Sequence, residues 1–598
     1  MPGMPLYGAT AAGPDRAVMR VRVFYAAVAV IFAVFLVRAF YLQVIRHDFY
    51  RKAALSDQFK EYQIPATRGI IQAHNGDDIV PIVLNQKLYT VYADPGLVKD
   101  AGRAAETLAA SLGGNANDYE QKLKTPHTRF VVLAKRVSAD KRGIILKHKY
   151  SGIGAQEVTY RTYPNGTLAA QLLGFVNEDG KGKYGIEQAL NAELAGRAGE
   201  LKAVTDVNGV PLAANTENVQ IAPVPGKQVV LTIDMSMQKQ LENILQQGLR
   251  NAKSDSGSAL IMDPNTGAIK AMANWPTYDP GNYADVDNGD VFNNATVSSP
   301  LEVGSIMKPL TAAAALDKGV VRKDTSYYDP AQWTVDGYKI TNIEEDGGAG
   351  RRTVADILNL SLNTGATWLL MQMGKQGDTD ITQKGRETWY DYMTNHYRLG
   401  QATGIEQGYE AEGSIPDPNK GYGRDLTYAN TSFGQGMTAT PLQMAAAFSA
   451  MVNGGTYYQP RLIDQMVEAN GKRTTVAPRA VRTSVVSPQV SRDMVALLEY
   501  VVEKHNLRPP FDQKQYAVGG KTGTAQIADP HGAGGYKEHD FNGTYLGFVG
   551  GNTPEYVIMV RVNEPKNGGY AGTAAAQPIF SSLAHMLIDN FEVAPKTQ

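Results

Sequence analysis

Cysteine is absent from this sequence of 598 residues. That absence excludes disulfides, Cys-ligated zinc, iron–sulfur clusters and a thiol nucleophile. Histidine is scarce as well: the nine His are scattered and none belongs to a His-Glu-x-x-His motif, so a His-based zinc site has little support. An excess of charge of either sign is also missing, because 58 Lys and Arg stand against 59 Asp and Glu. A chain-wide basic surface for nucleic acid is therefore excluded, and only a local basic patch stays open.

The chain does contain enough apolar material for large cores. Hydrophobic residues make up 43% of the sequence and charged residues 20%, a globular and not a disordered composition. At roughly 100–200 residues per domain, the length predicts two or three domains.

One long apolar run lies near the N-terminus. Residues 1–22 form a tail that begins rich in Gly, Pro and Ala, and residues 23–45 follow as VFYAAVAVIFAVFLVRAFYLQVI, with Arg38 as the one charge. About 20 apolar residues span a bilayer, so this run predicts a transmembrane helix with Arg38 reaching toward the interface. A cleaved signal peptide would need a small-x-small cleavage site, which AFYLQVIRH does not offer. A buried helix of a soluble domain is the other alternative.

The basic residues around this run do not decide its orientation. They lie on both sides of it: Arg16, Arg20 and Arg22 before, and Arg46, Arg51, Lys52 and Lys60 after. Long domains translocate largely regardless of such charges. The orientation must therefore come from the chemistry of the domains that follow.

A Pro/Gly linker, APVPGK at residues 222–227, is the best candidate for a domain boundary. Residues 46–221 mix short strand-like and helix-like runs. Residues 228–598 begin with a strand, an N-cap at Asp234 and an amphipathic helix, and they end with three strands and a closing helix. Between these, helices are expected at 303–317, 353–373, 441–452 and 488–505. Strands at both ends of a helical middle predict an α+β domain, an antiparallel sheet covered by helices.

Three short motifs carry candidate chemistry: Ser305-Ile-Met-Lys308, Ser361-Leu-Asn363 and Lys521-Thr522-Gly523. The first opens a helix that is apolar nearly all round, which predicts a buried helix. Ser and Lys three residues apart on a helix share a face, and burial makes Lys308 lose its proton more easily than a solvated lysine. A neutral lysine beside a serine hydroxyl is a general base next to a nucleophile.

Each motif alone also has a purely structural interpretation. The pattern S-x-x-K occurs twice more, at Ser138 and Ser236, in solvated settings, and the first motif alone would be a snorkelling lysine on a structural helix. Ser361 alone suits an N-cap, and Lys521 alone suits the edge of a strand. All three motifs in this order, on a helix start, an inter-helix loop and a strand, favour a single active site.

Together the motifs resemble those of the penicillin-binding protein and serine β-lactamase superfamily. Further segments resemble the class B penicillin-binding proteins. ATRGIIQAHNG, RTYPNGTLAAQLLGFV and YGIEQALNAELAGRAG are similar to the pedestal module of that class, and LTIDMSMQ, DPNTGAIKAMANWPTYDP and FGQGMTATPLQMAAAFSAMVNGG to its transpeptidase module. The resemblance covers nearly the whole chain. It departs at Ala73-His74, where the pedestal pattern usually has Asp-Arg, and this affects a local pedestal contact and not the catalytic assignment.

The fold that the resemblance implies is α+β. It consists of a single N-terminal transmembrane helix, a mixed pedestal (dimerisation-type) domain at 46–221 and a penicillin-binding/β-lactamase-like transpeptidase domain at 228–598.

The activity that it implies is that of a peptidoglycan D,D-transpeptidase. Ser305 would attack the penultimate D-Ala carbonyl of a stem peptide, release the terminal D-Ala and pass the acyl group to an amine of a neighbouring stem. Lys308 is the implied base. Ser361 and Asn363 would relay the proton and hold the substrate amide, and Lys521 would add positive charge.

The implied substrate-binding residues follow the lysine of the third motif: Thr522, Gly523 and Thr524. The two threonines suit the terminal carboxylate, and the backbone N–H groups of Ser305 and Thr524 would form the oxyanion hole. No cofactor or metal is expected. Because cross-linking takes place outside the cytoplasmic membrane, residues 46–598 are expected to face outward. The implied partners are stem peptides, β-lactams, a membrane glycan polymerase and other division proteins, and no nucleic acid.

Rival functions share the same motifs. A class A β-lactamase would need a deacylating glutamate in Glu-x-x-Leu-Asn between the second and third motifs, and the one such string begins at Glu187, in the pedestal. A β-lactam sensor would normally have several membrane spans, and a catalytically idle wall-synthesis scaffold would not need intact motifs.

Within class B, the elongation type and the division type also share these motifs. The direct run from the third motif into GTYLGFVGGNTPEYVIMVRVNEP, and an end without appended repeats, favour the division type. The Gly-rich segment DPHGAGGYKEHD before this run is either a mobile flap over the site or a loose hairpin.

Overall fold

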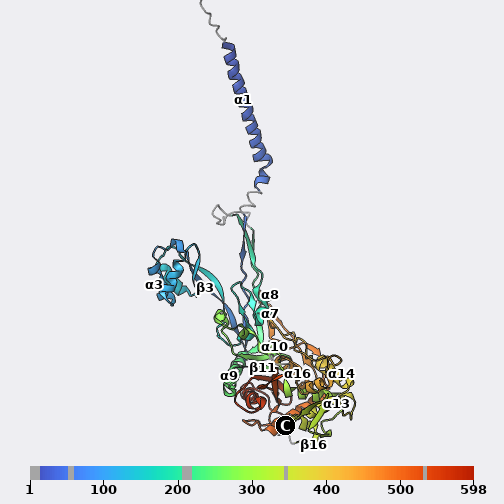
Figure 1. Cartoon of the computed structure of the whole chain (residues 1–598). Helices are drawn as coiled ribbons and strands as arrows, with labels where there is room; N and C mark the ends of the chain where they lie inside the picture. The colour runs from blue at the N-terminus through green and yellow to red at the C-terminus, as the bar shows by residue number, and fades with distance from the viewer. Residues whose placement is uncertain (1–13, 52–58, 205–218, 343–347, 529–534, 598) are drawn as a thin grey trace, which may run out of the picture. The chain divides into compact units, whose positions relative to one another are not determined.

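The computed structural model describes residues 14–51, 59–204, 219–342, 348–528 and 535–597 (Figure 1). Most of the predicted tail, and residues 529–534 of the Gly-rich segment, lie outside these ranges. The contacts divide the chain into two compact units. One consists of Met1–Ala66 and Arg197–Val224, and the other of Thr67–Gly196 and Pro225–Gln598.

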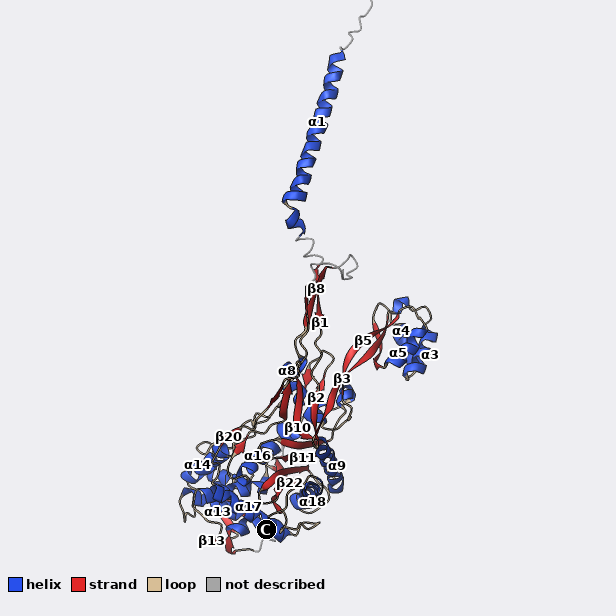
Figure 2. Ribbon diagram, turned by 180° about the vertical axis from the view of Figure 1, so that it is seen from behind, coloured by secondary structure: helices blue, strands red, loops and turns tan. Residues whose placement is uncertain are grey.

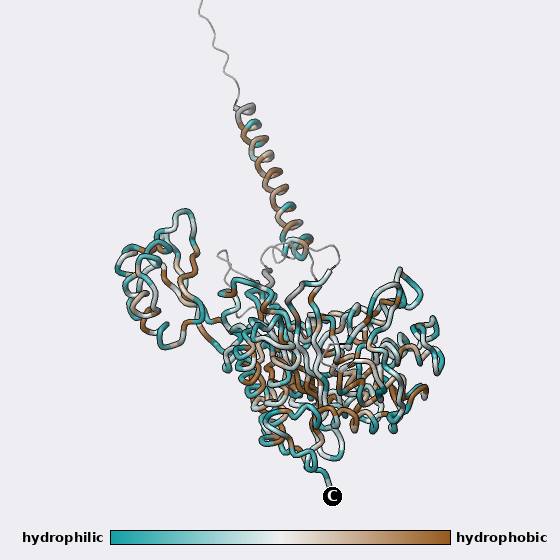
Figure 3. Tube along the Cα trace, turned by 60° about the horizontal axis from the view of Figure 1, so that its bottom comes forward, coloured by the Kyte–Doolittle hydropathy of each residue, from teal (hydrophilic) through white to brown (hydrophobic). Residues whose placement is uncertain are grey.

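The first unit contains the apolar run. Helix α1 (Pro14–Phe40) continues into a π-helical turn, η1 (Tyr41–Ile45). Among the described residues, 18–45 are the one helix long and apolar enough to cross a membrane. Its hydrophobic residues colour the helix mostly brown in Figure 3. The side chains of these residues are exposed, with Phe32 at 63%. A core helix would bury them, so the structure agrees with a single-pass membrane anchor that includes the predicted residues 23–45.

The same unit holds a small antiparallel sheet. Its strands are β1 (Phe59–Ile64), β8 (Gly199–Val204) and β9 (Val219–Ile221), in the order β1-β8-β9.

A mixed sheet in the second unit joins residues from both sides of the Pro/Gly linker. Its strands run in the order β19-β18-β10-β2-β3-β4, with β5 paired to β3. Their bounds are β2 (Ile71–Asn75), β3 (Asp78–Ala93), β4 (Val131–Val137), β5 (Ile153–Thr162), β10 (Gln228–Asp234), β18 (Ile463–Val467) and β19 (Arg473–Thr475). Strand β10, which follows the linker, pairs in parallel with β2, which precedes it. The domain limits 46–221 and 228–598 stay a prediction.

Three helices pack against β3, β4 and β5, and together these elements enclose a small separate core. They are α3 (Ala101–Leu112), α4 (Ala116–Leu123) and α5 (Ala139–Lys147).

The largest core surrounds a five-stranded antiparallel sheet, as the sequence predicts. The order is β12-β11-β23-β22-β21, with β11 (Ser256–Met262), β12 (Ile269–Trp275), β21 (Ala517–Ala528), β22 (Tyr536–Gly550) and β23 (Pro554–Asn563). Successive side chains of a strand point to opposite faces, and here both faces are covered. Ile261 and Ile558 join one apolar cluster, while Leu260 and Met559 join the other.

Helices form the two outer layers. Figure 2 shows α9 (Met235–Ala252) and α18 (Gln577–Asn590) on one side of β11 and β22, and α16 (Pro441–Val452) and α17 (Pro488–His505) on the other. Helix α9 begins where predicted, because the Asp234 carboxylate accepts the N–H of Met237 at 2.9 Å. The remaining helices of this region are α11 (Lys308–Asp317), α12 (Val354–Asn359), α13 (Asn363–Gly374), α14 (Gln383–Asp391) and α15 (Arg424–Thr431). The α+β fold is confirmed.

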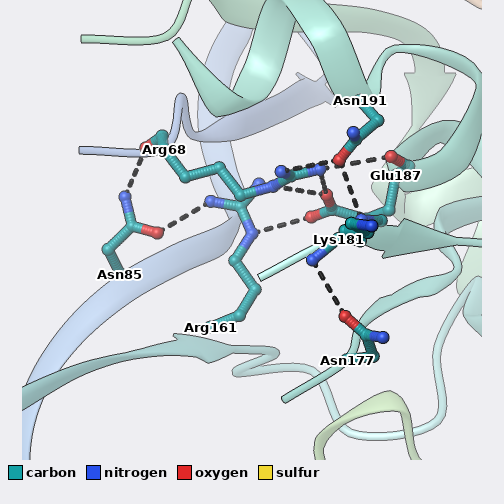
Figure 4. Close-up of polar contacts among 8 residues, drawn as sticks. Arg68, Asn85, Arg161, Asn177, Lys181, Glu187 and Asn191 are labelled. Carbon is teal, nitrogen blue, oxygen red and sulfur yellow. Dashed lines mark hydrogen bonds and ion pairs between the residues drawn. The ribbon is translucent and has the colours of Figure 1, made fainter. Parts of the chain in front are cut away.

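A buried ionic cluster connects the three sequence segments that resemble a pedestal module (Figure 4). The Glu187 carboxylate is fully buried and accepts Nε of Arg68 at 2.8 Å and Nε of Arg161 at 2.7 Å. Asn85 accepts from Arg161 and donates to the carbonyl of Arg68, while Asn191 accepts from Arg68 at 3.0 Å. Residues far apart in the sequence thus meet at one buried charge.

The departure from the pedestal pattern lies on β2. Ala73 is fully buried, and the His74 ring nitrogen Nε2 lies 3.3 Å from Oδ2 of Asp464 on β18. At this position the chain therefore has a contact between β2 and β18.

Candidate active site

The first motif lies at a tight turn against the edge strand β21. Gly304–Met307 form a 3₁₀ turn, η5, which leads into α11. Gly304 has φ 62°, and a Cβ there would lie 2.7 Å from the carbonyl oxygen of Thr524. Its N–H donates to the carbonyl of Gly434 at 3.0 Å. Only glycine allows the segment before Ser305 to approach β21 this closely.

Lys308 connects the first two motifs. Its side chain is fully buried, and all residues from Lys308 to Leu316 are buried, as the sequence predicts. Its Nζ donates to Oγ of Ser305 at 3.0 Å, to Oγ of Ser361 at 3.1 Å and to the carbonyl of Ser361. Ser305 itself is only half-buried, so a substrate can reach its hydroxyl.

The second motif lies between α12 and α13, in the predicted loop. Ser361 has φ 56°, a left-handed conformation that is costly for a residue with a Cβ. The N-cap residue of α13 is Leu362, which makes no side-chain cap. Ser361 therefore does not cap this helix, and both its carbonyl and its hydroxyl contact Lys308. Asn363 donates from Nδ2 to the carbonyl of Thr341 at 3.1 Å.

A buried acid that sequence reasoning missed supports the start of α13. Asp329 is fully buried and accepts the hydroxyl of Thr364, the residue after Asn363, at 2.7 Å. It also accepts the hydroxyl of Tyr327 at 3.1 Å, and burial raises the pKa of that tyrosine. No motif or spacing indicates Asp329, because its partners lie 35 residues and 2 residues away.

The third motif lies on β21, as predicted. Lys521 is 2% exposed, and its Nζ lies 3.3 Å from the carbonyl and 3.4 Å from Oγ1 of Thr522. A Cβ on Gly523 would lie 2.3 Å from Oγ1 of Thr544 and 2.9 Å from the carbonyl of Val303. The third motif therefore meets the first through close backbone packing, in which glycine is needed on both sides.

The last predicted site residue holds a loop in place. Oγ1 of Thr524 accepts the N–H of Gly572 at 3.0 Å, and Gly572 opens the turn that leads to α18. The other two S-x-x-K serines lie elsewhere: Ser138 caps α5, and Ser236 is exposed on α9.

Glu302 is a second residue that the sequence analysis missed. It precedes Ser305 by three residues, and its Oε1 accepts the N–H of Gly436 at 3.0 Å and the hydroxyl of Tyr536 at 2.9 Å. Burial raises the pKa of Glu302, and burial also raises the pKa of Tyr536 to about 12. Three segments around the nucleophile thus meet at this carboxyl.

The geometry suits nucleophilic catalysis. A serine hydroxyl within hydrogen-bond reach of a buried amine forms a nucleophile and base pair. The second serine contacts the same amine, and a buried second lysine lies on the adjoining strand. This set can transfer an acyl group through a serine ester.

Comparison with known families gives two matches. Residues 257–585 match the penicillin binding protein transpeptidase domain. Residues 63–231 match the penicillin-binding protein dimerisation domain.

Relatives are similar over nearly their whole length. Penicillin-binding protein PbpB of Mycobacterium tuberculosis is 30% identical over 605 residues, which cover 97% of this chain and 86% of that protein. Peptidoglycan D,D-transpeptidase FtsI of Escherichia coli K12 is 27% identical, with 93% and 89% covered. Among solved structures, penicillin binding protein 3 from M. tuberculosis, complexed with aztreonam, superposes with a TM-score of 0.66 at 26% identity and covers 89% of this chain and 98% of that one.

Proposed function

This chain belongs to the class B penicillin-binding proteins, and we propose that it cross-links peptidoglycan stem peptides through an acyl-enzyme on Ser305 during septal wall synthesis. Its activity is that of a peptidoglycan D,D-transpeptidase. The observation that carries the assignment of residues is the pair of hydrogen bonds from buried Lys308 to Ser305 and Ser361, at 3.0 and 3.1 Å.

Acylation begins with a proton transfer to Lys308. In this step the amine of Lys308 is neutral and accepts the proton of Ser305, whose Oγ lies 3.0 Å from Nζ. The freed Oγ attacks the carbonyl carbon of the penultimate D-Ala, and the bond to the terminal D-Ala nitrogen breaks. Ser361, which contacts the same amine, passes the proton to the departing amine.

Transfer then runs the same path in reverse. The amine of a neighbouring stem attacks the ester carbonyl, loses its proton to the same base and restores the Ser305 hydroxyl. The Asn363 side chain holds the substrate amide, and Lys521 with Thr522 and Thr524 holds the terminal carboxylate.

The carbonyl oxygen becomes negatively charged during both steps. The backbone N–H groups of Ser305 and Thr524 stabilise that charge. Gly523 provides the close packing that keeps these two segments together. Loss of one such donor typically lowers the rate by about 10²–10³.

The enzyme is proposed to lie at the cytoplasmic membrane. Helix α1 anchors it, and residues 46–598 face the outer side, where the substrate is assembled into the wall. A membrane glycan polymerase and other division proteins are the proposed partners. The septal role is supported by the sequence run from the third motif through GTYLGFVGGNTPEYVIMVRVNEP, which resembles division-type enzymes; an elongation role is the alternative.

β-Lactams are the proposed inhibitors, because a solved relative is complexed with aztreonam. The proposal is tested by intact-mass spectrometry of the full-length protein after incubation with benzylpenicillin. We expect a lasting adduct of one penicilloyl mass, absent from Ser305→Ala and retained in Ser236→Ala, the matched serine of a surface S-x-x-K. Rapid drug hydrolysis without an adduct would indicate a β-lactamase, and neither adduct nor hydrolysis would indicate an idle scaffold.

The septal role has its own test in cells. Depletion of the protein in its host should give filaments or chains with incomplete septa. Cells that round up while continuing to divide would contradict the septal role and support the elongation alternative.

A further inference from the structure

A groove of about 730 Å³ lies outside the catalytic motifs. It runs between the hairpin of β14 (Gln332–Val335) and β15 (Tyr338–Thr341) and the N-terminal end of α15. The lining combines aromatic rings with charges of both signs: Asp336, Tyr338, Arg386, Tyr422, Arg424 and Asp425. Its size lies in the range of small-ligand sites.

Both tyrosines in this groove are exposed to solvent. Tyr338 is 65% exposed, and Tyr422 is fully exposed. Folding gains nothing from an aromatic ring that stays in water, since its stabilising effect comes from burial. Two such rings in one concave surface indicate contact with a ligand.

Hydrogen bonds and an ion pair hold part of the groove's lining, and the charges of the lining balance. Arg386 is 7% exposed, forms an ion pair with Asp425 and donates to the carbonyl of Pro418 at 3.2 Å. Asp336 accepts the N–H of Leu426 at 3.1 Å, which fixes the hairpin to α15. Two arginines and two aspartates in the lining leave no net charge, which disfavours a polyanion and suits a neutral ligand with many hydroxyl and amide groups.

The hairpin that forms this groove also contacts the catalytic loop. The carbonyl of Thr341, at the end of β15, accepts from Asn363 at 3.1 Å. Tyr338 lies three residues along the same strand, about 10 Å away at 3.3 Å per residue. Tyr338, which lines the groove, therefore lies about 10 Å along β15 from Thr341, the residue that contacts Asn363.

We propose that this groove binds the glycan strand that carries the stem peptide. Sugar rings have an apolar face of C–H groups, which stacks on Tyr338 and Tyr422, and a rim of hydroxyl and acetamido groups, which hydrogen-bond to Arg424 and Asp336. The inference rests on the proposed function, because it assigns the polymer attached to the same substrate.

The dimensions of the substrate agree with this placement. In a pentapeptide stem that ends in D-Ala-D-Ala, three residues separate the acylated residue from the sugar. Extended chain covers at most about 3.3–3.6 Å per residue, so these residues span about 10 Å. Three extended residues are therefore long enough to cover the distance along β15 from Thr341, which accepts a hydrogen bond from Asn363, to Tyr338 in the groove.

Binding can be tested without the reaction. The full-length Ser305→Ala protein in detergent is titrated calorimetrically with an oligosaccharide of alternating N-acetylglucosamine and N-acetylmuramic acid, whose lactyl carboxyl groups are converted to simple amides so that the probe is neutral. We expect saturable binding that Tyr338→Ala combined with Tyr422→Ala weakens about tenfold, a change of about 1.4 kcal/mol. Tyr328→Ala is the matched control, because Tyr328 is 69% exposed on β13 (Ser326–Asp329) and does not line the groove. No binding, or an equal loss in the control, would overturn the proposal.

A second experiment separates glycan binding from peptide binding. The intact enzyme is compared on a free pentapeptide and on the same pentapeptide attached to its disaccharide. We expect the double tyrosine variant to raise KM for the disaccharide substrate only. An equal rise for the free peptide would overturn the glycan assignment. Oligosaccharide binding with no penicilloyl adduct on Ser305 would instead reject the proposed function and leave the glycan site in place.

Discussion

Removal of the buried carboxylate at Glu187 should destabilise the second unit strongly. The side chains of Arg68 and Arg161 are 10% and 5% exposed, and Glu187 is fully buried between them. In Glu187→Gln two guanidinium groups would stay buried without their counter-charge. Breaking a buried ion pair by removing one partner typically costs about 3–5 kcal/mol. Because two cations share this one carboxylate, we expect the upper half of that range.

The assay is urea unfolding of the full-length protein, monitored by tryptophan fluorescence. All four tryptophans lie between residues 225 and 598, so the signal reports on the unit that contains the cluster. Glu178→Gln is the matched control. Glu178 pairs with Lys135 at the surface, where its side chain is 73% exposed, and solvent screens such a pair. The control should therefore unfold close to the wild-type midpoint.

Acylation by benzylpenicillin provides an independent readout. The cluster touches none of the three catalytic motifs, so the Glu187→Gln protein that stays folded should be acylated at the wild-type rate. If Glu187→Gln and Glu178→Gln unfold at the same urea concentration, the burial argument is refuted. If the variant is stable but no longer acylated, the cluster acts on the catalytic site and not on stability.

Three further predictions concern the catalytic region. Gly304→Ala should abolish most benzylpenicillin acylation, because the new Cβ would lie 2.7 Å from the carbonyl of Thr524 and φ is 62°; wild-type acylation kinetics would contradict this. Asp329→Ala leaves buried hydroxyls without an acceptor, which should lower the free energy of unfolding by about 1–3 kcal/mol. It should also slow acylation, because the segment that presents Asn363 is held less firmly. A lower unfolding midpoint with normal acylation kinetics would limit Asp329 to a stabilising role. Burial raises the pKa of Glu302, so the folded state binds its proton more tightly than the unfolded state. The contribution of Glu302 to stability is then fully present below the ordinary Glu pKa and is lost as the pH rises through its raised folded-state pKa. Glu302→Gln should remove this part of the dependence of stability on pH, measured by thermal unfolding.

Local patterns in the sequence determined the helices and the motifs. Helices α16 and α17 have the predicted bounds, because each begins with a capping Thr or Ser followed by proline. The N-cap at Asp234 and the apolar strands of the five-stranded sheet were also predictable, since both signals lie within a few residues. The helix expected at 303–317 begins instead with a 3₁₀ turn at Gly304, whose conformation is imposed by the packing against β21.

Only the tertiary structure decided which distant residues meet. The predictions named Ser305, Lys308 and Ser361, but the 3.0 and 3.1 Å contacts that join them depend on how α11 packs against the loop before α13. Asp329 and Glu302 had no sequence signal, and the parallel pairing of β10 with β2 crosses the predicted domain boundary. Helix periodicity and caps are encoded within one or two turns, whereas a strand partner or a buried charge is chosen by residues tens to hundreds of positions away, and a single sequence does not specify that choice by its pattern.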